Sequence, residues 1–112
     1  MESVIREIEN AVGDNGRVIP RTAVHASLID KNDPLVKNCA DALREVIFEE
    51  PAVSVFPACT EAGMFSAICG IPTLILGPGD IKSAHTGHEY CECRQITDCA
   101  KVFARLIEKY IE

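Results

Sequence analysis

Two histidines and two cysteines lie close together in the last third of the chain. His85, His88, Cys91 and Cys93 fall within nine residues, and all four side chains are of types that bind zinc. One interpretation is a closed structural zinc site built from all four. Because their spacing is not that of the common zinc knuckles and no paired C-x-x-C is present, we also consider His85 alone as a ligand or acid–base group.

A glycine-rich loop precedes these residues. The stretch from Gly77 to Ser83, GPGDIKS, invites comparison with loops that bind phosphate. The residue before Lys82 would have to be glycine and is Ile81, and Asp80 would place a negative charge in the anion cradle. The loop therefore predicts a tight turn rather than a nucleotide site.

Apolar periodicity and capping residues predict the helices that must position these groups. The predicted helices cover residues 3–12, 34–48, 61–69 and the stretch from Thr97 to near the C-terminus. Asp33 is the type of residue that caps a helix, and Pro34 suits its first position. Thr60 can cap the third helix, and Gly70 stands where a glycine commonly ends one.

Three β-prone segments complete the predicted elements. Residues 17–26 contain Pro20, which restricts them to an edge strand or two short pieces. Residues 53–56 predict a short strand, and the continuous apolar run over 71–76 is typical of a buried parallel strand. The last two strands, with a helix between them, predict a right-handed β-α-β unit.

In parallel sheets, ligands bind beyond the carboxyl ends of the strands. In this chain those ends are residues 57–61 and 77–89, which also carry much of its glycine and polar content. The sequence therefore predicts the functional site at these two stretches.

Composition excludes several classes of protein. The 112 residues are 47% apolar and 25% charged, which is ordinary for a globular domain. The net charge of −6 and the absence of Trp argue against nucleic-acid binding. No apolar run approaches the ~20 residues that span a bilayer, and the N-terminus does not have the pattern of a secretory signal. Since Cys39, Cys69 and Cys99 lie in apolar helical patterns, we expect a reduced, cytoplasmic protein without a membrane partner.

Several short motifs carry a resemblance to a known family. They are Cys59-Thr60-Glu61-Ala62, the run from Gly70 to Gly79, Ala84-His85-Thr86 and Glu89-Tyr90. In order and spacing they resemble the end of the metal-dependent amidohydrolases that include acetylornithine deacetylase, succinyl-diaminopimelate desuccinylase, aminoacylase and related peptidases. The Cys-Thr-Glu-Ala form looks most like the acetylornithine deacetylase branch. The resemblance is specific over about residues 53–110 and weaker over 1–52.

The resemblance implies an α/β fold: the C-terminal β-α-β-α segment of a zinc-exopeptidase-like catalytic domain, preceded by the last helix and strand of a lid domain. Residues 1–27 would be the remnant of the lid or dimerisation domain. Residues 28–112 would be the C-terminal part of the catalytic domain. The family's catalytic domain holds two metal ions, usually zinc, with cobalt or manganese as alternatives.

The resemblance also assigns roles to individual residues. His85 falls on the position of the family's last metal ligand, and Glu89, four residues later, would help to hold this ligand in place. Gly77, Pro78 and Gly79 match the loop that brings backbone close to the substrate. Thr60 and Glu61 match the turn that lines the substrate pocket.

The chain departs from the family pattern in one large respect. The family's other metal ligands and its general-base Glu belong to motifs that none of the 112 residues match. A single His cannot hold a pair of catalytic ions, so we expect a fragment that is inactive alone and is completed by an N-terminal catalytic segment. We also expect it to form a homo-oligomer.

In the intact enzyme the substrate would be a small N-acyl amino acid, such as N-acetylornithine, or a peptide. Metal-activated water would attack the amide. The alternative is a small self-standing zinc-binding or interaction module that uses His85, His88, Cys91 and Cys93.

Overall fold

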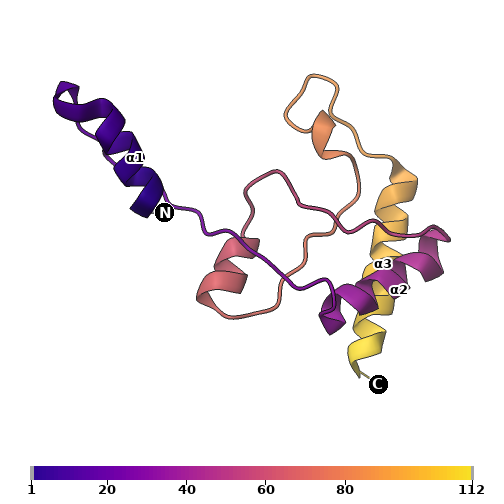
Figure 1. Ribbon diagram of the computed structural model, residues 1–112. Coiled ribbons are helices and arrows are strands. Elements are labelled where there is room, and N and C mark those ends of the chain that lie inside the picture. The colour runs from indigo at the N-terminus through magenta and orange to yellow at the C-terminus, as the bar shows by residue number, and fades with distance from the viewer. Residues whose placement is uncertain (1, 112) are drawn as a thin grey trace.

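The computed structural model describes residues 2–111, and it is built from three helices joined by long irregular segments (Figure 1). The helices are α1 (Glu2–Val12), α2 (Pro34–Ile47) and α3 (Cys93–Ile111). Shorter helical turns cover Gly13–Asn15, Met64–Ile68 and Ile81–Ser83. None of the helices over residues 2–111 is long and apolar enough to cross a membrane.

The predicted β-α-β-α segment is wrong for the described residues, which contain no β-strand. The segments 17–26, 53–56 and 71–76 are all irregular. A strand exists only where a neighbour satisfies its backbone N–H and C=O groups, and no backbone hydrogen bond in the described part joins 53–56 to 71–76. The apolar pattern of a segment indicates that its side chains favour burial, but it does not determine whether a neighbouring strand is present to pair with it.

The helix α2 begins and ends where the sequence predicts. The Asp33 carboxylate accepts a hydrogen bond from the Leu35 amide at 2.8 Å, and Pro34 occupies the first turn. At the other end Phe48 takes a left-handed φ of 57°, and its amide donates to the Arg44 carbonyl at 3.0 Å. Both ends of the helix are therefore closed by local interactions.

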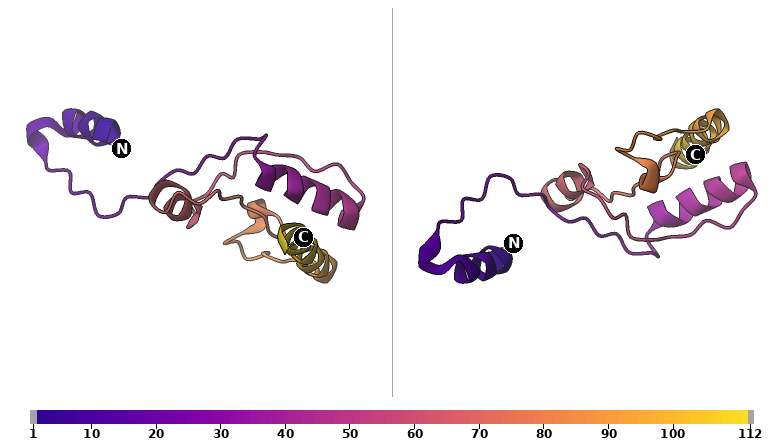
Figure 2. Two further views of the ribbon diagram at one scale, coloured as in Figure 1. Left: turned by 90° about the horizontal axis from the view of Figure 1, so that it is seen from below. Right: turned by 90° about the horizontal axis from the view of Figure 1, so that it is seen from above.

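The buried core lies between α2 and α3, which pack side by side (Figure 2). Val102 of α3 and Ala42 of α2 are both 0% exposed, and Cys39 is 2% exposed. At the edge of this interface Lys109 forms an ion pair with Glu45 at 3.0 Å. Apolar burial between these helices is therefore the main source of tertiary stability.

The last helix starts one turn earlier than predicted. It begins at Cys93, and Thr97 lies inside it with its hydroxyl donating to the Cys93 carbonyl at 2.9 Å. Threonine can bond backward to the preceding turn as well as cap the following one. Here the backward bond forms, so Thr97 is not the cap.

The helix α1 confirms the prediction for residues 3–12 but has no helical partner in the described chain. Its apolar face includes Val4 at 55% and Ile8 at 47% exposure. Figure 1 shows α1 standing apart from the α2–α3 pair. An amphipathic helix with an open apolar face is suited to a partner surface.

The predicted helix 61–69 is mostly a short π-helical turn. The Cys69 amide donates to the Met64 carbonyl at 3.2 Å, five residues back. Gly70 has a φ of 67°, so the predicted glycine stop is confirmed. At Gly63 a Cβ atom would lie 1.7 Å from the His25 carbonyl oxygen, so the two backbones touch there and only glycine fits.

Candidate functional site

The loop that carries His85 is closed by bonds among its own residues. The Asp80 carboxylate accepts from the Lys82 amide at 2.9 Å and begins the turn Ile81–Ser83. The Ser83 hydroxyl donates to the Asp80 carbonyl at 2.8 Å, and the Thr86 hydroxyl donates to the Ser83 carbonyl at 2.7 Å. Short side chains that bond to nearby backbone groups favour a fixed turn here.

His85 is placed on this loop in an unusual backbone conformation. Its φ is 60°, in the left-handed region that side chains other than glycine rarely adopt. The Glu89 carboxylate accepts from the His85 amide at 3.0 Å. The residue is exposed, and no hydrogen bond of its imidazole occurs among residues 2–111. The ring is therefore free to bind a ligand or a metal ion.

The Gly77–Gly79 loop is attached to α3 through a residue that the sequence analysis missed. The Gln95 side-chain oxygen accepts from the Gly79 amide at 3.1 Å. Gly79 has a φ of 93°, which requires glycine. Nothing in the local sequence indicates this bond, because its partners are sixteen residues apart.

A cavity of about 210 Å³ lies between this loop and the α2–α3 pair. Its apolar wall includes Leu43, Ile47 and Val102, and its polar wall includes Gln95 and Asp98. The predicted substrate residues Gly77, Pro78 and Gly79 form its rim. The loop thus borders a small hollow that has both apolar and polar surface.

Asp98 is the charged group of this cavity. Lys101 donates to it at 2.9 Å, and Arg94 lies 3.5 Å from its second oxygen. The hydrogen bond from Lys101, followed by the charges of Lys101 and Arg94, lowers the pKa of Asp98. Asp98 therefore stays ionised at the wall and is already paired with cations.

The predicted substrate turn at Thr60 and Glu61 lies elsewhere in the described chain. The Thr60 hydroxyl accepts from the Ala62 amide at 3.2 Å, which confirms its capping role. Figure 1 shows this turn and the 80–89 loop in different parts of the chain. Within residues 2–111 no hydrogen bond or ion pair joins Thr60 or Glu61 to residues 77–89.

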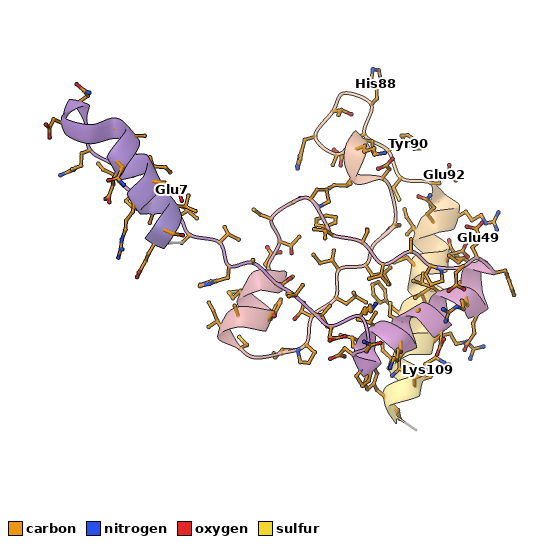
Figure 3. The ribbon with its side chains drawn as sticks, in the orientation of Figure 1. Glu7, Glu49, His88, Tyr90, Glu92 and Lys109 are labelled. Atoms are coloured by element: carbon orange, nitrogen blue, oxygen red, sulfur yellow. The ribbon has the colours of Figure 1, made fainter. Side chains whose placement is uncertain are left out.

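The four-residue zinc cluster is not assembled. No three His, Cys, Asp or Glu side chains in the described part of the chain come together to hold a metal ion. Figure 3 shows His88 at the outer end of its loop, pointing away from the chain. Cys91 and Cys93 are exposed. The self-standing module built on His85, His88, Cys91 and Cys93 is therefore not supported by this arrangement.

The thiols near the helix pair are protonated rather than reactive. All six cysteines are free. Burial raises the pKa of Cys39, and the neighbouring Cys99 raises it further. Burial also raises the pKa of Cys99, with a smaller contribution from Cys91. A raised thiol pKa suits a packing role, because the thiolate is the reactive form.

Comparison with known proteins gives a family match over most of the chain. The sequence model of one family, described as peptidase family M20/M25/M40, matches residues 14–109. The chain is similar to acetylornithine deacetylases of Buchnera aphidicola (44% identical), Proteus mirabilis (40%) and Vibrio cholerae (40%), each over 52 residues. That stretch covers 46% of this chain and 13% of each relative. No solved structure matches the chain significantly.

Proposed function

Because the chain belongs to peptidase family M20/M25/M40, we propose that it is the C-terminal part of a metal-dependent amide hydrolase. Its substrate is a small N-acyl amino acid, such as N-acetylornithine, or a short peptide. The names of the relatives support the deacetylase form of this proposal. The aligned stretch covers 13% of those relatives, and we propose that the remaining catalytic groups lie on a partner segment.

His85 is the proposed metal ligand, and this assignment carries the proposal. The imidazole is exposed on a loop held by four local hydrogen bonds, and the ring itself is uncommitted. A neutral imidazole is a good ligand for zinc. A pair of ions bound there would polarise the amide carbonyl and lower the pKa of a water. This chain supplies one ligand, so the others come from the partner segment.

The glycine loop and the Thr60–Glu61 turn are the proposed substrate-binding elements. Gly77, Pro78 and Gly79 border the cavity beside α3, and Gln95 fixes the backbone of Gly79. A backbone fixed before binding orients a substrate at lower entropic cost. Glu61 is exposed and can face a polar group of the substrate in the completed enzyme.

The open shape of the chain supports a partner segment. The radius of gyration is 18.6 Å, whereas a compact domain of this length has about 13 Å. Large apolar side chains such as Val55 at 90% and Leu28 at 93% are exposed. We propose that residues 28–112 complete a catalytic domain and that residues 1–27 are the end of a lid domain. The same surfaces favour a homo-oligomer when the partner is absent, and the six free cysteines favour a reducing, cytoplasmic location.

Complementation tests the proposal. The 112-residue chain would be combined, in the presence of zinc, with an acetylornithine deacetylase of Vibrio cholerae from which the 52-residue stretch that matches this chain has been deleted. We expect release of free ornithine from N-acetylornithine by the mixture and by neither piece alone. Replacing His85 by Ala in the chain removes most of this activity, because one metal ligand is lost.

His88→Ala is the matched control. His88 lies three residues from His85 on the same exposed loop, and we expect its loss to leave turnover unchanged. Hydrolysis by the chain alone, or full activity of the His85→Ala mixture, would refute the proposal. Sedimentation of the chain alone at tens of micromolar checks self-association, for which a purely monomeric profile is the contrary result.

A further inference from the structure

The backbone of His85 is held in a conformation that its own side chain disfavours. A φ of 60° brings the Cβ atom of a non-glycine residue close to the preceding backbone carbonyl group, so the conformation costs free energy. Such a conformation persists only where surrounding interactions fix it. Within the described residues the only side chain that bonds to the His85 backbone is Glu89.

We propose that Glu89 is a positioning residue that acts on the backbone of His85 rather than on its imidazole. Its carboxylate accepts from the His85 amide at 3.0 Å, across a loop of four residues. A hydrogen bond to an ionised acceptor is stronger than one between neutral groups. The Glu89 amide itself donates to the Thr86 carbonyl at 3.2 Å, which fixes the residue that holds His85.

This arrangement leaves both ring nitrogens of His85 available. A carboxylate on the ring would fix one nitrogen, but here the carboxylate is used at the main chain. The direction of the Cα–Cβ bond is then set before any ligand arrives, because φ is fixed. A pre-set ligand direction lowers the cost of binding. The inference that this backbone interaction serves metal binding rests on the proposed function. The interaction itself can be measured in the chain alone.

The first experiment is nuclear magnetic resonance on the labelled 112-residue chain. A positive φ gives a strong contact between the amide and α protons of the same residue, so His85 reports its own conformation. In Glu89→Ala we expect this contact to weaken and the His85 amide to exchange with solvent about tenfold faster. In Glu89→Gln we expect both signals to remain near those of the unmodified chain, since the amide oxygen accepts the same bond.

Glu92→Ala is the matched control, because Glu92 is an exposed acid on the same stretch (Figure 3) whose carboxylate makes no hydrogen bond in the described chain. We expect no change at His85 in this variant. Unchanged exchange and an unchanged proton contact in Glu89→Ala would overturn the inference.

A second experiment measures zinc affinity in the complemented enzyme. We expect Glu89→Ala to weaken zinc binding about 10- to 100-fold, which is the scale of one lost hydrogen bond to a charged group, and Glu89→Gln to restore it. Unchanged zinc affinity in Glu89→Ala, when His85→Ala does weaken it, overturns the positioning role. If His85→Ala leaves zinc affinity unchanged, the proposed function fails instead, and the resonance experiment still decides where Glu89 acts.

Discussion

The contact between Gly63 and the backbone of His25 gives a sharp test of the tertiary structure. A Cβ atom on residue 63 would lie 1.7 Å from the His25 carbonyl oxygen and 2.6 Å from its carbonyl carbon. Cβ contacts shorter than 3.0 Å essentially never occur. In Gly63→Ala the two backbones must therefore separate by more than about 1 Å.

Separation of two packed backbones has a known scale of cost. Forcing an extra carbon into a close-packed contact typically costs about 1–3 kcal/mol. Gly63 is buried, so the new methyl group cannot turn into solvent. We expect the free energy of unfolding of Gly63→Ala to fall by that amount, with the long segment around His25 released from the turn at 62–69.

Denaturant unfolding followed by circular dichroism measures the first effect, and hydrogen exchange of the peptide around His25 measures the second. Gly77→Ala is the matched control, because nothing lies within 4 Å of a Cβ atom there. Its unfolding free energy is expected to change by no more than about 1 kcal/mol. Equal stability and equal exchange in Gly63→Ala and Gly77→Ala would show that the backbones do not touch.

Three further predictions follow from the helices. Val102→Ala is expected to lower the free energy of unfolding by about 2 kcal/mol, because Val102 is 0% exposed at the α2–α3 interface. Val53→Ala is the control, because Val53 is 62% exposed and its loss is expected to cost no more than about 0.5 kcal/mol. Equal losses in the two variants would refute this packing. Asp33→Ala is expected to cost about 1 kcal/mol in the same denaturant assay, and no loss would mean that the cap is not formed. The hydrogen bond from Arg44 lowers the pKa of Glu50 below its ordinary 4.5. The stability that this ion pair contributes is therefore complete above pH 4.5 and is lost as the pH falls through the lower pKa of the folded state. The midpoint temperature of thermal unfolding should fall with pH over this range, and it should fall less in Glu50→Gln; the same dependence on pH in both proteins would contradict the pairing.

The sequence by itself determined the features that depend on near neighbours. The start of α2 follows from Asp33 and Leu35, two residues apart, and the stop at Gly70 follows from the freedom of glycine at positive φ. The family resemblance was also present in short motifs, and the match over residues 14–109 confirms it. Such features are local in sequence, so a single chain carries the information for them.

Local patterns gave wrong predictions where the same residues are compatible with two different local structures. Thr97 is a good helix cap by type, but its hydroxyl bonds back to Cys93 and the helix begins one turn earlier. The apolar run 71–76 is a good buried strand by composition, but the described residues offer no strand beside it. Composition measures how much a segment gains from burial and says nothing about what will cover it.

Tertiary structure alone decided the contacts between distant residues. The bond from Gly79 to Gln95 spans sixteen residues, and the contact of Gly63 with His25 spans more than twice as many. No local sequence pattern marks either pair, because each contact forms only when the intervening chain folds so that the two residues meet. The closure of a long segment depends on the whole intervening chain rather than on any one residue. The sequence therefore suggested candidate site residues but could not predict the long-range contacts that hold their loops.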